Sequence, residues 1–258
     1  MTAPLLALDG IRKRFGRVTV ADGVSFAVAP GDAIGVVGPN GAGKTSLFGI
    51  ISGDLAPDDG TVRFQGRDVT AAEPADRCRL GIGRTYQVPR PFEEMTVFEN
   101  VLVAAQQGAG ARGRAGFARA ADVLDRTGLR PEANRPAGQL GLLQRKRLEL
   151  ARALATGPSL LLLDEVAGGL TDPEVLELVE VVRAARADGV AVIWIEHVVR
   201  ALTATVDRLL CLAGGHIIGD GTPDEVLASP AVKEVFLGTE ATAAALTEAG
   251  LPDGPGPP

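Results

Sequence analysis

Cysteine is scarce in this chain. The 258 residues include two cysteines, Cys78 and Cys211, which lie far apart and in no metal-binding spacing. A disulfide framework and a cysteine-ligated metal site are therefore excluded as the basis of the fold. Reduced thiols, as in cytosolic proteins, are the expectation.

An excess of positive charge and long apolar runs are also missing. The formal net charge is −6, whereas a nucleic-acid-binding surface carries clustered Lys and Arg, so no nucleic-acid partner is expected. No apolar run approaches the ~20 residues of a membrane-spanning helix, and the first residues form no secretory signal. The length and the 46% hydrophobic content suit one large globular domain with a subdomain.

A glycine-rich string follows a short apolar run. Residues 33–37 are apolar and largely β-branched, as in a buried parallel strand, and residues 44–51 have the apolar spacing of a helix. Between them, residues 38–45 read Gly-Pro-Asn-Gly-Ala-Gly-Lys-Thr. The glycines allow a close backbone approach to a ligand, and the N–H groups that open the helix attract an anion. A phosphate-binding P-loop explains this context better than an ordinary glycine-rich turn.

The P-loop interpretation predicts a set of nucleotide-binding residues. They are Gly38, Pro39, Asn40, Gly41, Ala42, Gly43, Lys44, Thr45 and Ser46. Lys44 would place its charge on the β- and γ-phosphates, and the Thr45 hydroxyl would reach Mg²⁺. The chain is therefore expected to bind a nucleoside triphosphate.

A second strand ends in two carboxylates. Residues 160–163 are four leucines, followed by Asp164 and Glu165. A continuous apolar run is typical of a strand buried on both faces, and ligands of open α/β sheets bind at the carboxyl ends of the strands. Asp164 is thus a candidate Mg²⁺ ligand, and Glu165 a candidate general base for an attacking water. Two solvated acids at a strand end are the plainer alternative.

These motifs resemble the ATP-binding subunits of ATP-binding-cassette (ABC) transporters over residues 5–238. Phe15 matches the aromatic residue that stacks on adenine in that family. Gln87 matches the glutamine that reaches Mg²⁺ and links the site to the membrane subunits, and His197 matches the histidine near the γ-phosphate. Taken singly, Phe15 could be a core residue, Gln87 a loop residue and His197 structural. The joint order of the motifs is more specific than any member.

The resemblance implies a fold and a set of cofactors. The fold class is α/β, a P-loop NTPase of the ABC type with a parallel-sheet core, an antiparallel β subdomain and a helical subdomain inserted at about residues 88–155. Residues 239–258 form a C-terminal tail whose proline- and glycine-rich end is predicted to be disordered. A mobile loop is expected over residues 107–116. The cofactors implied are ATP and Mg²⁺.

The resemblance also implies roles for the site residues. The metal ligands would be Thr45, Gln87 and Asp164, and the catalytic residues Glu165 and His197.

Local sequence narrows the subfamily. Residues 81–87, 91–101, 147–154, 164–171 and 221–238 resemble ATPases of branched-chain amino acid importers. This implies a peripheral protein on the cytoplasmic face of the membrane that hydrolyses ATP to drive uptake through two separate permease subunits, and that is served indirectly by an extracytoplasmic solute-binding protein. An export-linked or non-transport ABC ATPase, or a nucleotide-binding regulator of low turnover, remains an alternative.

One departure from the family concerns its signature loop, leucine-serine-glycine-glycine-glutamine. That loop falls on residues 140–144, with Leu143 in place of the second glycine. In the family this loop closes on the γ-phosphate bound by the opposite subunit, and a leucine there is expected to obstruct the approach. Val166 and Thr171 are smaller departures, at positions where proline and aspartate are usual. We therefore expect a heterodimer with a related ATPase subunit that supplies a normal signature.

Overall fold

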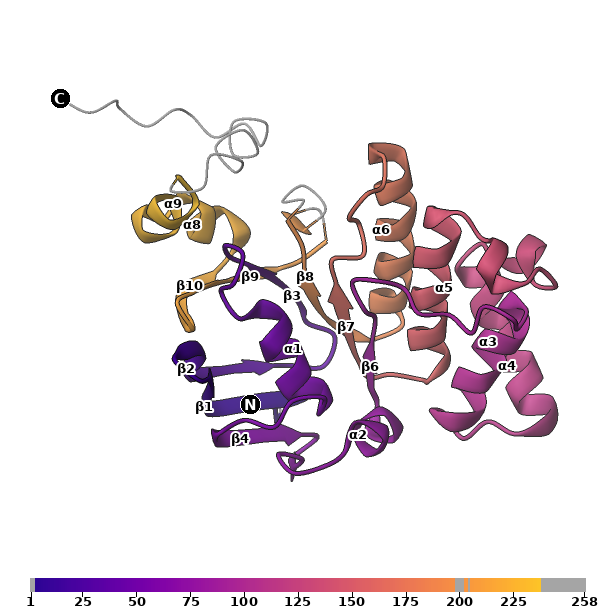
Figure 1. The fold of residues 1–258 in the computed structure, drawn as a ribbon, viewed down its shortest axis with the longest axis horizontal. Coiled ribbons are helices and arrows are strands. Elements are labelled where there is room, and N and C mark those ends of the chain that lie inside the picture. The colour runs from indigo at the N-terminus through magenta and orange to yellow at the C-terminus, as the bar shows by residue number, and fades with distance from the viewer. Residues whose placement is uncertain (1–2, 198–201, 204, 238–258) are drawn as a thin grey trace.

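A six-stranded, mostly parallel sheet forms the centre of the molecule in the computed structural model, which describes residues 3–197, 202–203 and 205–237 (Figure 1). The strand order is β10-β9-β3-β8-β7-β6, and all neighbours are parallel except β10, which pairs antiparallel with β9. The strands are β3 (Ala33–Val37), β6 (Ile82–Arg84), β7 (Leu160–Asp164), β8 (Ala191–Ile195), β9 (Arg208–Ala213) and β10 (His216–Gly221). The strand predicted before the P-loop, β3, is thus central.

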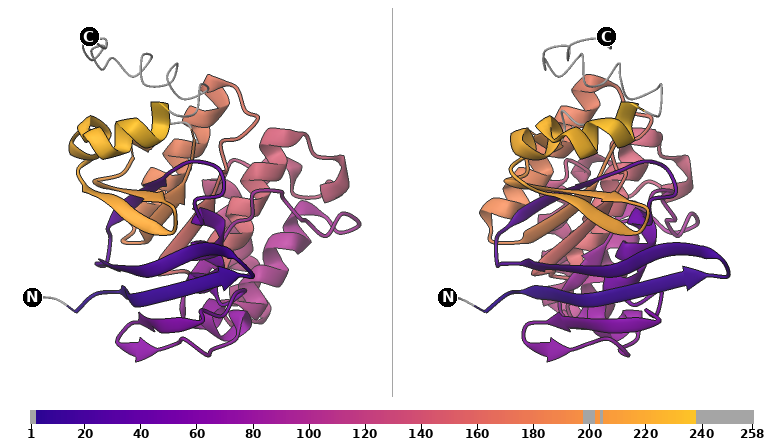
Figure 2. Two further views of the ribbon diagram at one scale, coloured as in Figure 1. Left: turned by 60° about the vertical axis from the view of Figure 1, so that its left-hand side comes forward. Right: turned by 90° about the vertical axis from the view of Figure 1, so that its left-hand side faces the viewer.

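A second, four-stranded sheet is antiparallel throughout and has the order β2-β1-β4-β5. Its strands are β1 (Leu6–Phe15), β2 (Val18–Val28), β4 (Asp59–Phe64) and β5 (Arg67–Asp68). In both views of Figure 2 the long strands β1 and β2 lie across one end of the molecule. Helices α8 (Pro223–Ala228) and α9 (Pro230–Leu237) lie towards the other end.

Helix α1 (Lys44–Ser52) packs between the two sheets. The strands of the parallel sheet alternate between two buried clusters, because successive side chains of a strand point to opposite faces. Leu160 and Leu162 of β7 belong to the buried cluster that includes α1 and the antiparallel sheet. Leu161 and Leu163 belong to the cluster on the opposite face of the parallel sheet. The run of four leucines therefore serves two cores at once, which explains why it shows no polar alternation.

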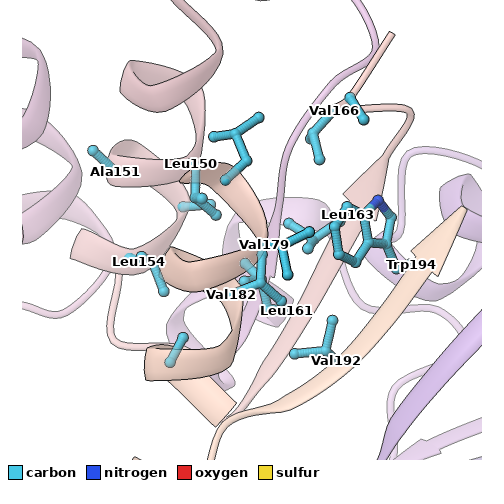
Figure 3. Packing of buried hydrophobic residues seen from close by; sticks show 14 of the residues in the cluster. Leu150, Ala151, Leu154, Leu161, Leu163, Val166, Val179, Val182, Val192 and Trp194 are labelled. Atoms are coloured by element: carbon cyan, nitrogen blue, oxygen red, sulfur yellow. The ribbon is translucent and has the colours of Figure 1, made fainter. Parts of the chain in front are cut away.

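The second face of the parallel sheet is covered by α5 (Leu142–Ala155) and α6 (Asp172–Ala187). In Figure 3, Leu150 of α5 and Val179 and Val182 of α6 point towards Leu161 and Leu163 of β7. Trp194 of β8 is fully buried in the same cluster. Helix α5 therefore shares a buried cluster with the strand that carries Asp164.

The helical part of the chain begins after β6 and the short helix α2 (Pro74–Leu80). Its elements are α3 (Val97–Gln107), α4 (Gly113–Arg126), the 3₁₀ turns η1 (Arg130–Glu132) and η2 (Ala137–Gln139), and α5. Thr96 caps α3 in a capping box with Glu99. The loop expected over residues 107–116 is too long, because α4 already begins at Gly113. These helices lie to one side of the sheet core in Figure 1.

The α/β fold class expected from the sequence is confirmed. Among the helices that the structure describes, none has both the length and the apolar character needed to cross a bilayer. The predicted tail, residues 239–258, lies outside the described residues.

Candidate functional site

The P-loop turns sharply between β3 and α1, and two of its glycines are required by their surroundings. Gly38 has φ 150° and Gly43 has φ 98°. A Cβ on Gly38 would lie 2.0 Å from the Leu212 backbone oxygen, and one on Gly43 would lie 2.1 Å from that of Val20. A Cβ on Gly41 would meet no atom within 4 Å, although its φ is 79°. The loop is therefore packed tightly on its protein side and open where the motif presents its backbone.

Lys44, the first residue of α1, turns its side chain back into this loop. Its ammonium donates to the backbone oxygens of Gly38 (2.7 Å) and Pro39 (3.0 Å). Burial lowers the pKa of Lys44, while the nearby Glu165 and Asp164 act in the opposite direction. A cation is thus preorganised beside the loop. Asn40, Gly41 and Thr45 are exposed, Pro39, Gly43 and Ser46 are half-buried, and Ala42 is buried.

Asp164 ends β7 next to the P-loop, at the carboxyl edge of the sheet. Its side chain is buried, and Oδ2 lies 3.4 Å from Arg84 Nη2. Oδ1 has no hydrogen-bond partner in the described part of the chain. Burial raises the pKa of Asp164, with Arg84 lowering it in part. A buried carboxylate oxygen without a donor suits a divalent cation, so the Asp164 side chain fits Mg²⁺.

Glu165 joins three separate segments of the chain. Its Oε2 accepts a hydrogen bond from Gln87 Nε2 (2.5 Å), and its Oε1 lies 2.8 Å from His197 Nε2. The structure therefore brings together Gln87, Glu165 and His197, which stand 78 and 32 residues apart in the sequence.

The backbone of Glu165 is unusual. Its φ is 48°, in the left-handed region that residues other than glycine seldom adopt. Such a conformation costs about 1–3 kcal/mol and persists only where the surroundings hold it. Here the Glu165 N–H donates to Ile195 O (2.9 Å) and the Glu165 carbonyl accepts from Lys146 Nζ (3.0 Å). The turn aims the carboxylate at Gln87 and His197.

Phe15 lies apart from this cluster, at the end of β1. Its ring is 51% exposed, and Lys13 Nζ lies 5.5 Å from the ring centroid. A buried core role for Phe15 is therefore wrong. An exposed ring offers the flat apolar face that stacking on a base requires.

Three charged residues close to the site escaped the sequence prediction. Arg84 bonds Asp54 (2.7 Å) as well as Asp164. Lys146 donates to the backbone oxygens of Gln87 and Glu165. Buried Glu196 accepts from Ala167 N (2.6 Å) in the turn after Glu165. A signal existed for Lys146, since it and Glu149 occupy buried positions of α5 among apolar residues.

The signature loop begins α5, with Gly141 as its N-cap. Leu142 is 48% exposed, whereas Leu143 is half-buried and packs against the core cluster of α5 and α6. Part of the Leu143 side chain thus turns inward. Thr171 is the N-cap of α6, in a capping box with Glu174, and Val166 is buried. Thr171 therefore has a clear local role as a helix cap.

The buried carboxylate yields a stability prediction. Burial raises the pKa of Asp164, so the folded state binds this proton more tightly than the unfolded state. As the pH rises from below 3.8 through the folded pKa, deprotonation of Asp164 therefore lowers the free energy of unfolding. Above the folded pKa the penalty is complete. Asp164→Asn should raise the Tm of the nucleotide-free chain by roughly 2–4 °C, which corresponds to about 1 kcal/mol.

Thermal unfolding at pH 7 and at pH 4 checks this, and the gain should shrink at pH 4. Asp122→Asn, at an exposed site on α4, is the control and should leave the Tm nearly unchanged. A lower Tm for Asp164→Asn at pH 7 would show that its contact with Arg84 outweighs the burial cost.

Comparisons with known proteins agree with this geometry. A model of the ABC transporter family matches residues 21–168, and a model described as a branched-chain amino acid ATP-binding cassette transporter matches residues 216–242. The high-affinity branched-chain amino acid transport ATP-binding protein LivG of Salmonella typhimurium is 35% identical, over 92% of this chain and 99% of that protein. The corresponding BraF protein of Pseudomonas aeruginosa is 33% identical over 92% and 99%.

A solved structure leads to the same family. The ADP conformation of an ATP-binding cassette of an ABC transporter superposes with a TM-score of 0.82 at 32% identity, covering 92% of this chain and all of that one. The chain belongs to the ABC transporter family, as an ATP-binding subunit and ATPase similar to the branched-chain amino acid transport ATP-binding proteins.

Proposed function

We propose that this chain is the ATPase of an importer for branched-chain amino acids or related small solutes. It hydrolyses ATP at the cytoplasmic face of the membrane, and separate permease subunits carry the solute. The names of its relatives support the solute class. The observation that carries the proposal is the contact of the Glu165 carboxylate with both Gln87 and His197, beside the P-loop.

The chemistry follows from these positions. Backbone N–H groups of residues 38–46 and the Lys44 ammonium would bind the phosphates, and the exposed Phe15 ring would stack on adenine. Thr45, Gln87 and Asp164 would hold Mg²⁺, which neutralises phosphate charge when bound. Glu165 would orient the attacking water and take its proton as general base. His197, at 2.8 Å from that carboxylate, would hold it in place and lie near the γ-phosphate.

Two permease subunits are the proposed membrane partners. A cavity of about 210 Å³ lies beside Arg84 and Tyr86 and continues to Glu149 and Arg152 of α5. Tyr86, Val88 and Phe92 expose large apolar surfaces in the segment next to it. Exposed apolar patches of this kind are typical of protein interfaces. A permease docked here would lie directly on the segment that holds Gln87, and a solute-binding protein would act through the permeases.

A second, related ATPase subunit is the other proposed partner. The P-loop, Asp164, Glu165 and His197 of this chain form an intact half-site, whereas Leu143 alters the signature that it offers to the opposite subunit. In a dimer of two copies of this chain, each intact half-site would face the altered signature of the other copy. A heterodimer with a normal signature would retain a competent site on this chain's P-loop.

Substitution of Leu143 tests the heterodimer. Leu143→Gly should raise the ATPase rate of the isolated chain several-fold, because the backbone can then approach the phosphate. It should also lower the Tm, because Leu143 packs against the core cluster. Leu143→Ala keeps a Cβ and should restore less activity. A fast wild-type rate that neither variant changes would contradict the proposed asymmetry.

Isolation of the native complex tests the proposed function as a whole. A tag on this chain should retrieve two permease subunits and a second ATPase. In proteoliposomes this complex should take up branched-chain amino acids in proportion to ATP hydrolysed. Outward transport would favour an export-linked ATPase. Retrieval of soluble partners alone, with negligible turnover, would favour a nucleotide-binding regulator.

A further inference from the structure

Lys146 is a buried lysine in α5 whose ammonium bonds to the backbone of two site residues. Its side chain is in a residue only 5% exposed, and its ammonium donates to two backbone carbonyls, those of Gln87 (3.2 Å) and Glu165 (3.0 Å). These are the two residues whose side chains meet at 2.5 Å in the candidate site. One cation therefore spans the backbones of both residues.

The same face of α5 contacts the rest of the segment around Gln87. Glu149 and Arg152 follow Lys146 at intervals of three residues, so the three side chains lie along one face of the helix. Arg152 donates to Arg90 O (2.7 Å) and lies over the Phe92 ring. Burial raises the pKa of Glu149, which Arg152 and the backbone N–H groups of Tyr86 and Arg90 counteract. Residues 86–92 are thus attached to α5 at several points.

Lys146 differs from its two neighbours in one respect. Glu149 and Arg152 bond to the segment of Gln87, whereas Lys146 bonds both to that segment and to the Glu165 carbonyl. That carbonyl belongs to the residue with φ 48°, whose conformation needs support from its surroundings. The other hydrogen bond to it, from Gly168 N, is long at 3.4 Å.

We propose that Lys146 is a positioning residue for ATP hydrolysis. It holds the backbones of Gln87 and Glu165 in one arrangement and so couples the position of α5 to the direction of the Glu165 carboxylate. The inference deepens the proposed function and rests on it. Lys146 does not touch the reacting atoms. It acts through Glu165, whose side chain can meet Gln87 and His197 only while its backbone keeps the left-handed turn.

The environment of Lys146 suits a fixed cation. Burial lowers its pKa, and Glu196, Glu165, Asp164 and Glu149 act in the opposite direction. Acidic groups from β7, from the end of β8 and from α5 itself therefore surround the ammonium. The ammonium donates to both carbonyls at once, so it fixes the position of each carbonyl relative to the other.

Three variants of the full chain test the proposal. Lys146→Met keeps most of the length of the side chain, one heavy atom shorter, without the charge or the donors. Lys146→Arg keeps the charge and offers five N–H donors in a planar group. Lys233→Met, on α9 beside β10 at the opposite edge of the sheet from β6, is a control that removes a lysine elsewhere. Each is assayed for ATP affinity by calorimetry with Mg²⁺, for kcat and KM in the assembled complex, for Tm, and for amide hydrogen exchange in the isolated chain.

The expected result is a division between turnover and binding. Lys146→Met should lower kcat at least about 10-fold and change ATP affinity less than about 2-fold, because the P-loop is untouched. Hydrogen exchange should quicken in residues 85–90 and 164–168 together and stay unchanged in β3 and β9. Lys146→Arg should recover most of the rate, and Lys233→Met should match the wild type.

Other outcomes overturn the inference. An unchanged kcat for Lys146→Met, or quicker exchange in residues 85–90 without residues 164–168, would show that Lys146 does not position Glu165. Parallel losses of kcat, affinity and Tm would indicate a purely structural role. A wild-type chain that neither binds nor hydrolyses ATP would instead overturn the proposed function. Hydrogen exchange in the Lys146 variants would still test the positioning role in that case, so the two failures can be told apart.

Discussion

Glu165→Gln should slow ATP hydrolysis by about 10²-fold or more, because a positioned general base usually contributes that much to the rate. ATP should still bind. Glutamine keeps the shape of the side chain and an oxygen that can accept from His197, but it cannot take a proton from water. The variant should also accumulate the ATP-bound dimer, because the step that separates the subunits is blocked. Single-turnover hydrolysis and size-exclusion chromatography with ATP measure the two effects.

A matched control uses the same chemical change on a nearby surface. Glu180 of α6 pairs with Arg183 and is exposed, so Glu180→Gln should leave hydrolysis near the wild-type rate. If Glu165→Gln hydrolysed ATP as fast as the wild type, Glu165 would not be the base, and its contacts with Gln87 and His197 would have another purpose.

Lys44→Ala should weaken ATP binding by about 10²-fold or more. The substitution removes a charge-assisted contact to the phosphates, and charged hydrogen bonds are about twice as strong as neutral ones. It also removes the bonds from the ammonium to the Gly38 and Pro39 carbonyls, which hold the loop in the nucleotide-free chain. Both effects act against binding, so the loss should exceed that of a single hydrogen bond.

Calorimetry with Mg²⁺ present measures this loss, with Lys233→Ala on α9 as the control. Thermal unfolding separates loss of the ligand contact from loss of the fold. Removal of a buried charge offsets part of the lost loop contacts, so the Tm of Lys44→Ala should stay close to that of the wild type. Unchanged affinity for ATP would contradict the P-loop assignment.

Much of the site could be predicted from the sequence because its determinants are local. A strand at residues 33–37, followed by three glycines and a lysine within residues 38–45, specifies a turn whose backbone N–H groups face a ligand, and the structure places that turn between β3 and α1. The leucine run before Asp164 likewise carries its own evidence, since burial on both faces leaves an unbroken apolar stretch. Family resemblance added Gln87 and His197, to which no local pattern assigns a role.

Other features were decided only by tertiary structure. The sequence alone suggested a loop over residues 107–116 because glycine and alanine are frequent there, but α4 begins at Gly113 and packs against α3. Propensity is a weak local preference that tertiary packing overrides. Lys146 and Gln87 lie 59 residues apart in the sequence, and Arg84 and Asp164 lie 80 apart, so no local pattern reports these contacts.

The sequence by itself determined the P-loop turn and the buried strand that ends in Asp164, because the spacing and burial of each motif are properties of a single strand and its turn. The tertiary structure decided how those residues meet. The order β8-β7-β6 brings the ends of three strands side by side, and with them His197, Glu165 and Gln87. Helix α5 then packs on β7 and directs Lys146 to two of their carbonyls. Such contacts depend on sheet order and helix packing, which act between segments far apart in the chain.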